Sequence, residues 1–198
     1  MKIGVHHSSK NFRSYRAERV KSLFNCVDGY RFDLEAELPV DDEEWQLGLI
    51  VGPSMGRAFF RPQAFYGDGA WAANKPIIEA ISPGRPFDEI TAALSAVGLG
   101  SVPAWLRPYC ALSNGEKFRA DLARIICERP AQIVIDEFTS VVDRQIARIG
   151  ALAFGKAWKR GPGKAVLLSC HYDIIDWLEP DWVFDTATGK YSGRGLWR

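Results

Sequence analysis

The chain has 198 residues, of which 47% are hydrophobic and 25% charged, and its formal net charge is +1. These values predict a soluble protein of one domain, residues 1–198, with a sizeable core. The near-zero charge does not indicate nucleic-acid binding, and no apolar run approaches the ~20 residues of a membrane-spanning helix. Four cysteines without a close pair, and an N-terminus without a secretory signal, predict a cytoplasmic protein with reduced thiols.

The N-terminal part is predicted to be an antiparallel β subdomain of about residues 12–45. Residues 19–24 half-alternate between polar and apolar side chains, and residues 31–38 alternate strictly. Asp28-Gly29 lies between them and is typical of a tight turn. We therefore expect a hairpin of these two strands.

Beyond residue 45, apolar runs alternate with amphipathic stretches. The expected buried strands are 45–51, 132–135, 164–170 and 182–184, followed by a turn at Thr188-Gly189 and a short last strand. Residues 116–128 and 143–159 are expected to be helices. A proline-containing stretch of about 71–111 reads as an insert of short helices. This alternation predicts an α/β fold with a mainly parallel sheet flanked by helices.

Three of these strands end in chemically useful residues, namely Gly52, Asp136-Glu137 and His171. Ligands of open α/β sheets bind beyond the carboxyl ends of the strands. Each residue alone has a structural explanation, since glycines end many strands, Asp and Glu cap helices and single histidines are often structural. Their joint placement favours a site for nucleotide hydrolysis. Asp136 would bind Mg²⁺, Glu137 would polarise a water molecule, and His171 would contact a γ-phosphate.

The start of the helix expected at 116–128 allows two interpretations. Ser113 has a hydroxyl group and Gly115 permits close backbone approach, so this helix end is a candidate anion site. Ser113 followed by Glu116 three residues later is also the pattern of a capping box. The sequence leaves both interpretations open.

These segments together resemble the ATP-binding-cassette (ABC) ATPases. Leu112-Ser-Asn-Gly-Glu116 resembles the family's signature motif, and residues 132–137 resemble its Walker B strand with the following glutamate. Ser140-Val-Val-Asp143 is similar to the D-loop, and residues 167–171 are similar to the switch-histidine strand. The four motifs occur in the family's order. The short insert and the segment 136–143, with the sequence DEFTSVVD, resemble the family's soluble, non-transporter branch.

The resemblance implies a P-loop NTPase-like fold that uses ATP and Mg²⁺, with Asp136 as the metal ligand and Glu137 and His171 as catalytic residues. It also implies a head-to-tail homodimer, or a pair with a second ABC or other protein partner. The residues implied to complete the opposite chain's site are Ser113, Asn114, Gly115 and Glu116. Asp143 would couple the two sites across the dimer.

The phosphate-binding loop departs from the family pattern G-x-x-x-x-G-K-[ST]. Gly52, Pro53 and Ser54 fit its start, but Gly56 follows too early, Arg57 stands where lysine is expected, and a hydroxyl residue is missing. The better alignment takes residues 55–60 as the helix after a loop that has lost about six residues. In the alternative alignment Gly56 and Arg57 serve as the loop's glycine and cation, although arginine is longer and planar.

Three functional hypotheses remain open on the sequence alone. The first is an ABC-type ATPase with impaired nucleotide binding and weak or residual activity. The second is a nucleotide-independent protein-interaction module that retains the ABC fold. The third is a deleted version of a competent enzyme.

Overall fold

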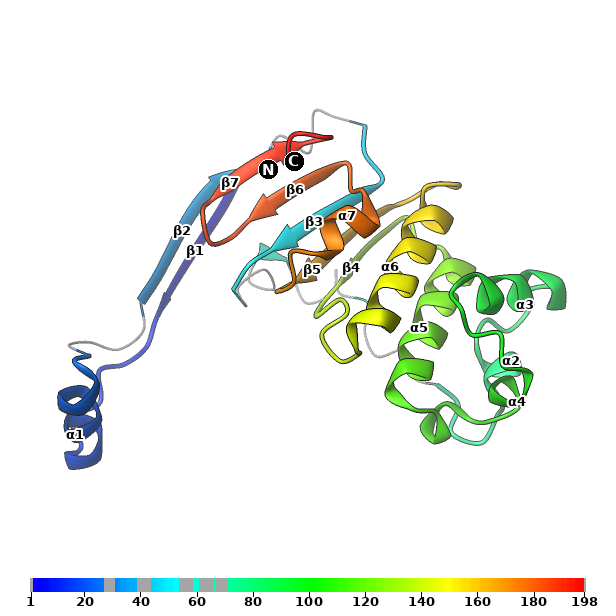
Figure 1. Ribbon diagram of the computed structural model, residues 1–198, viewed down its shortest axis with the longest axis horizontal. Helices are drawn as coiled ribbons and strands as arrows, with labels where there is room; N and C mark the ends of the chain where they lie inside the picture. The colour runs from blue at the N-terminus through cyan, green and yellow to red at the C-terminus, as the bar shows by residue number, and fades with distance from the viewer. Residues whose placement is uncertain are drawn as a thin grey trace. The chain divides into compact units, whose positions relative to one another are not determined.

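The computed structural model describes residues 2–26, 31–38, 44–53, 59–60, 66 and 71–197. The chain divides into two compact units, 1–43 and 44–198. In the first unit, strand β1 (Lys2–Ser8) pairs antiparallel with strand β2 (Arg31–Glu37), and helix α1 (Tyr15–Phe24) lies between them in the sequence (Figure 1). An antiparallel pair of strands is therefore present in the N-terminal part, with a helix in the connection between them.

The expected first strand of this hairpin was wrong, because residues 19–24 belong to helix α1 and the partner of β2 is β1. The Ser14 side chain accepts a hydrogen bond from the Ala17 amide and caps the helix, and Asn25 ends it with a left-handed φ of 51°. A capped segment rich in Arg and Lys favours a helix over a six-residue half-alternation. The turn predicted at residues 28–29 lies outside the described residues.

The second unit contains a five-stranded sheet whose strand order is β4-β5-β3-β6-β7 (Figure 1). Its strands are β3 (Leu47–Val51), β4 (Gln132–Ile135), β5 (Lys164–Ser169), β6 (Trp182–Asp185) and β7 (Lys190–Gly193). The first four strands run parallel, and β7 pairs antiparallel with β6. This confirms the prediction of a mainly parallel sheet.

The helices of this unit lie where the sequence predicts them, except for a short helix after β5 that the sequence analysis did not expect. The insert contains α2 (Ile77–Ala80), α3 (Phe87–Ala96), α4 (Val102–Trp105) and the 3₁₀ turn η3 (Tyr109–Ala111). It is followed by α5 (Asn114–Glu128), α6 (Arg144–Trp158) and α7 (Ile174–Leu178). In the described part of the chain, none of the helices combines the length and apolar character that crossing a bilayer requires.

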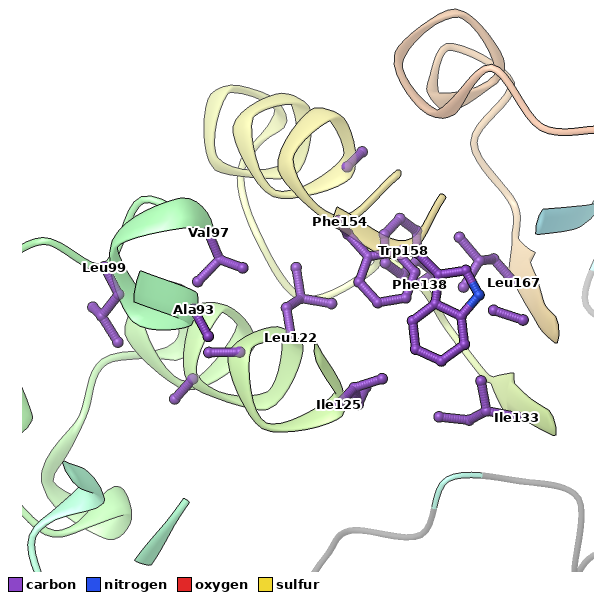
Figure 2. Close-up of a cluster of buried hydrophobic side chains, with 14 of the residues drawn as sticks. Ala93, Val97, Leu99, Leu122, Ile125, Ile133, Phe138, Phe154, Trp158 and Leu167 are labelled. Carbon is purple, nitrogen blue, oxygen red and sulfur yellow. The ribbon is translucent and has the colours of Figure 1, made fainter. Parts of the chain in front are cut away.

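The main hydrophobic cluster joins helices α3, α5 and α6 to one face of the sheet (Figure 2). Phe138, Phe154 and Trp158 are fully buried, with the Phe138 and Phe154 ring centroids 6.0 Å apart and those of Phe154 and Trp158 5.5 Å apart. Leu122 of α5 and Leu167 of β5 belong to the same cluster. This packing holds the segment after β4, which contains Phe138, between the helices and the sheet.

Candidate functional site

The carboxyl ends of β3, β4 and β5 are joined by backbone hydrogen bonds beyond the last strand residues. The Gly52 amide donates to the Ser169 carbonyl at 3.2 Å, and the Phe138 amide donates to the Leu168 carbonyl at 2.8 Å. Because β5 lies between β3 and β4, one sheet edge collects the residues that follow all three strands. The predicted residues at this edge are Gly52, Pro53, Asp136, Glu137 and His171.

The two carboxylates after β4 differ in their surroundings. Asp136 is half-buried, and its Oδ1 accepts a hydrogen bond from the Glu137 amide at 3.0 Å. Glu137 is exposed and has a φ of 48°, and Thr139 has a φ of 70°. Left-handed backbone is uncommon for residues other than glycine and is an outlier for a β-branched residue such as threonine. The turn that carries Glu137 is therefore strained and directs this carboxylate to solvent.

His171 is half-buried and follows the end of β5. Its amide donates to Ser169 Oγ at 3.1 Å, and its Nδ1 lies 3.5 Å from Cys170 Sγ. The next residue, Tyr172, donates its hydroxyl proton to Asp185 Oδ1 at 2.9 Å, which ties this segment to the end of β6. Burial and the Asp185 carboxylate raise the pKa of Tyr172.

Gly52 begins the predicted phosphate loop in a conformation that requires glycine, with a φ of 122°. A Cβ atom at this position would lie 2.3 Å from Oγ1 of Thr186. The Thr186 hydroxyl lies 3.1 Å from the Val51 carbonyl oxygen and 3.3 Å from that of Pro53, so it anchors the start of the loop. The remaining loop residues of the prediction, namely Ser54, Gly56 and Arg57, lie outside the described residues.

Sequence reasoning missed Thr186 and Asp185, although a signal for them exists. Both lie at the carboxyl end of β6, which is parallel to β3 and adjacent to it. Polar residues at the end of a parallel strand are candidates for a site by the same rule that singled out Asp136. Because the sequence predicts a strand at 182–184, the rule could have been applied to the two residues that follow it.

The start of α5 is a capping box, as one of the two sequence interpretations predicted. Ser113 Oγ accepts from the Glu116 amide at 3.4 Å, and Glu116 Oε2 accepts from the Ser113 amide at 2.8 Å. Arg107 donates to the other Glu116 oxygen at 2.7 Å. The hydrogen bonds from Ser113, followed by that from Arg107, lower the pKa of Glu116. The side chains of Ser113 and Glu116 therefore bind each other, while Asn114 is exposed in the first turn.

Gly115 and Asp143 stand where α5 and α6 begin, and the two helix starts are in contact. A Cβ atom on Gly115 would lie 2.6 Å from Cδ1 of Ile146 in the first turn of α6. Asp143 is the N-cap of α6, and its Oδ1 accepts from the Gln145 amide at 2.9 Å and the Ile146 amide at 3.0 Å. The structure thus gathers the predicted residues into two groups, one at the strand ends and one at these helix starts.

The described residues at the strand ends offer carboxylate oxygens but no positively charged side chain. Asp136 and Glu137 supply the carboxylate oxygens that Mg²⁺ prefers. Among the described residues that directly follow β3, β4, β5 and β6 there is no Lys or Arg to neutralise phosphate oxygens. No group of three or more His, Cys, Asp or Glu side chains suited to a metal ion occurs within the described ranges. Any cation for a triphosphate must therefore come from elsewhere, such as Arg57.

Curated relatives of the chain include ATP-binding proteins, although no protein-family model matches it. It is 32% identical over 147 residues to the cytochrome c biogenesis ATP-binding export protein CcmA of Rhodospirillum rubrum, which covers 65% of this chain and 61% of that protein. It is 32% identical over 108 residues to the nickel import ATP-binding protein NikO of Rhodobacter capsulatus, or 54% of this chain and 41% of that protein. The chain thus spans less than two thirds of either relative.

Solved structures of ABC cassettes have the same fold. A dimeric structure of the cassette MJ0796 in a post-hydrolysis state with ADP and Pi aligns with a TM-score of 0.59 at 10% identity and covers 98% of both chains. Another dimeric structure of MJ0796, a bacterial ABC transporter cassette, aligns with a TM-score of 0.57 at 9% identity, covering 93% of this chain and 94% of that one. The chain therefore resembles these ATP-binding proteins in sequence and shares its fold with the ABC cassettes.

Proposed function

We propose that the chain is an ABC-type ATP-binding and ATP-hydrolysing domain whose nucleotide binding is impaired by its shortened phosphate loop. The observation that carries this proposal is the single sheet edge that collects Gly52, Asp136, Glu137 and His171. The sequence after Gly52 lacks the lysine and the hydroxyl residue of a phosphate loop. Each charge-assisted hydrogen bond to phosphate contributes about 1.5–3 kcal/mol, so losing even one weakens affinity about tenfold or more.

The residues at the edge would have separate roles. Mg²⁺-ATP would supply the phosphoanhydride bond to be cleaved and the cation that neutralises its oxygens. Asp136 is the residue that would hold the metal, directly or through water. Glu137, exposed on its turn, would accept a hydrogen bond from the attacking water and orient it. His171 would donate a hydrogen bond to a phosphate oxygen.

We further propose a head-to-tail homodimer or a pair with a second ABC protein. The dimeric MJ0796 cassettes support this arrangement by their likeness in fold. In the proposed dimer, the first turn of α5 at Ser113, Asn114 and Gly115 faces the nucleotide of the opposite chain. Backbone N–H groups at a helix N-terminus attract anions, even when the N-cap side chain is already bonded to Glu116. Asp143, at the adjacent start of α6, would couple the two sites.

We place the chain in the soluble, non-transporter branch and in the cytoplasm. The short insert that contains α2 to η3 supports the branch. The four cysteines of the chain are free thiols, which suits a reducing compartment. The second candidate function is a nucleotide-independent protein-interaction module. It is favoured by one observation, namely the missing lysine and hydroxyl of the phosphate loop.

Calorimetric titration of the chain with ATP, with and without Mg²⁺, tests the proposal. We expect weak, Mg²⁺-dependent binding and slow turnover that Glu137→Gln abolishes. A second variant replaces residues 52–58 by a loop of the pattern G-x-x-x-x-G-K-S and should tighten binding at least tenfold. The matched control is the same loop with alanine in place of its lysine. If neither the wild type nor the restored loop binds ATP, the interaction module is the correct alternative.

A further inference from the structure

Arg144, the first residue of α6, contacts both segments that carry the proposed catalytic residues. Its Nε donates to Asp173 Oδ2 at 3.0 Å, and a second guanidinium nitrogen donates to Asp173 Oδ1. A third nitrogen donates to Thr139 Oγ1 at 3.4 Å. Thr139 lies two residues after Glu137, and Asp173 lies two residues after His171. One side chain therefore connects the turn after β4 to the segment after β5.

The turn after β4 needs such a support because its backbone is strained. Glu137 and Thr139 both have left-handed φ angles, and Thr139 is only 1% exposed. The Ser140 amide closes the turn on the Glu137 carbonyl at 2.9 Å. Strained residues of this kind persist only where the surrounding structure holds them in place. The bond from Arg144 to the Thr139 hydroxyl is one of these holding contacts.

The contacts of Asp173 also indicate a dedicated pairing. Asp173 precedes helix α7, yet its side chain makes no capping hydrogen bond there, and both of its oxygens accept from Arg144. The guanidinium carbon also lies 5.0 Å from the ring centroid of Trp177 in α7. A planar fork that bonds two carboxylate oxygens and packs on an aromatic ring is a geometry that lysine cannot reproduce.

We propose that Arg144 is a positioning residue that holds the Glu137 turn and the His171 segment in a fixed relation to each other. The Arg144 and Asp173 side chains are 37% and 47% exposed, so their ion pair contributes little to global stability. Its effect is local and geometric. The catalytic consequence rests on the function proposed above, whereas the structural linkage does not.

Amide hydrogen exchange in the nucleotide-free chain tests the linkage directly. We expect Arg144→Met to accelerate exchange at Ser140 and His171 by tenfold or more, while the amides of β6 and β7 stay unchanged. The matched control is Arg148→Met, because Arg148 is exposed on the same helix one turn later. Acceleration in only one of the two segments, or equal acceleration by the control, would overturn the proposal.

Two further variants keep the linkage testable if Arg144→Met does not fold. Asp173→Asn keeps the size of the side chain and removes its charge. Arg144→Lys keeps the charge and removes the planar guanidinium group with its paired N–H donors. Each should accelerate both segments, and the double variant Arg144→Met/Asp173→Asn should exchange no faster than Arg144→Met alone. Additive effects of the two substitutions would contradict the linkage.

Steady-state kinetics then separate the linkage from the proposed activity. With measurable turnover, Arg144→Met should lower kcat at least tenfold, since it displaces the residues that act on the phosphate. An unchanged kcat with accelerated exchange refutes the catalytic consequence. Absence of turnover in the wild type refutes the proposed function, and the exchange measurements still decide the linkage.

Discussion

The Thr186 hydroxyl occupies the space that any side chain at position 52 would need. A Cβ atom on Gly52 would lie 2.3 Å from Thr186 Oγ1, and this oxygen is within hydrogen-bond distance of the carbonyl oxygens on both sides of Gly52, those of Val51 and Pro53. The glycine and the threonine therefore depend on each other. Together they determine where the chain leaves β3 toward the predicted phosphate loop.

We expect Thr186→Val to lower the free energy of unfolding by about 0.5–1.5 kcal/mol, because it removes the hydrogen bond of the buried hydroxyl while the Val51 carbonyl keeps the Thr186 amide as a donor. Thr186→Ser retains the hydroxyl and should cost less than about 1 kcal/mol. Urea unfolding of the two variants measures the difference. A loss for serine that exceeds the loss for valine would show that the methyl group, and not the hydrogen bond, accounts for the stabilisation.

Gly48 has a packing role in the middle of β3. It pairs with Trp182 of β6, and a Cβ atom on Gly48 would lie 2.1 Å from Cζ2 of the fully buried indole. We expect Gly48→Ala to destabilise the fold by about 2–3 kcal/mol, since overpacking of a rigid core displaces the ring or the strand. Thermal or urea unfolding provides the value.

Gly193 of β7 is the matched control for Gly48, because no atom lies within 4 Å of a Cβ atom built there. Gly193→Ala should change stability by less than about 0.5 kcal/mol. A second check is Trp182→Leu, which should reduce the penalty of Gly48→Ala in a double-mutant cycle. A penalty that is the same in both backgrounds would mean that the ring is not what the new methyl group meets.

The capping box of α5 predicts a pH dependence of stability. Hydrogen bonds from Ser113 and then from Arg107 lower the pKa of Glu116 in the folded chain below the ordinary value of a glutamate carboxyl group. The lowered pKa means that the stabilising contribution is complete above about pH 4.5 and is lost as the pH falls through the lower, folded-state pKa. Glu116→Gln should therefore differ most from the wild type near neutral pH and least in acid.

Urea unfolding of the wild type and Glu116→Gln at several pH values measures this difference. Taking the difference between the unfolding free energies of the two proteins at each pH removes the contributions of all other carboxylates, which both proteins share. Glu89→Gln is the control, because Glu89 pairs with Arg85 on an exposed surface of α3 and caps no helix. A stability difference for Glu116→Gln that is constant down to pH 3 would contradict the assignment.

The four cysteines should differ in reactivity. Cys127 is 6% exposed and burial raises the pKa of its thiol, whereas Cys26, Cys110 and Cys170 are exposed. The thiolate is the reactive form, so we expect three thiols to react rapidly with a thiol-specific reagent and Cys127 to react slowly. Mass spectrometry of the labelled peptides identifies them, and all four should react in denaturant. Rapid labelling of Cys127 in the folded chain would contradict its burial.

Local patterns predicted the buried part of the fold well. The continuous apolar runs identified β3, β4, β5 and β6, because strands covered on both faces leave no place for polar side chains. The capping box at Ser113 and Glu116 was also a local prediction, since its partners are three residues apart. The expected strand at 19–24 failed because six residues of partial alternation do not distinguish a strand from a turn and a half of helix, whereas the Ser14 cap does.

By itself, the sequence determined the set of buried strands, the starts of α5 and α6 and the residue types that follow each strand, because all three are carried by neighbouring residues along the chain. Only the tertiary structure decided which strand ends are adjacent, and hence that Thr186 anchors the Gly52 turn and that Arg144 connects Thr139 to Asp173. These contacts join residues whose proximity depends on strand order and helix packing, and neither is encoded in a local pattern of polar and apolar side chains.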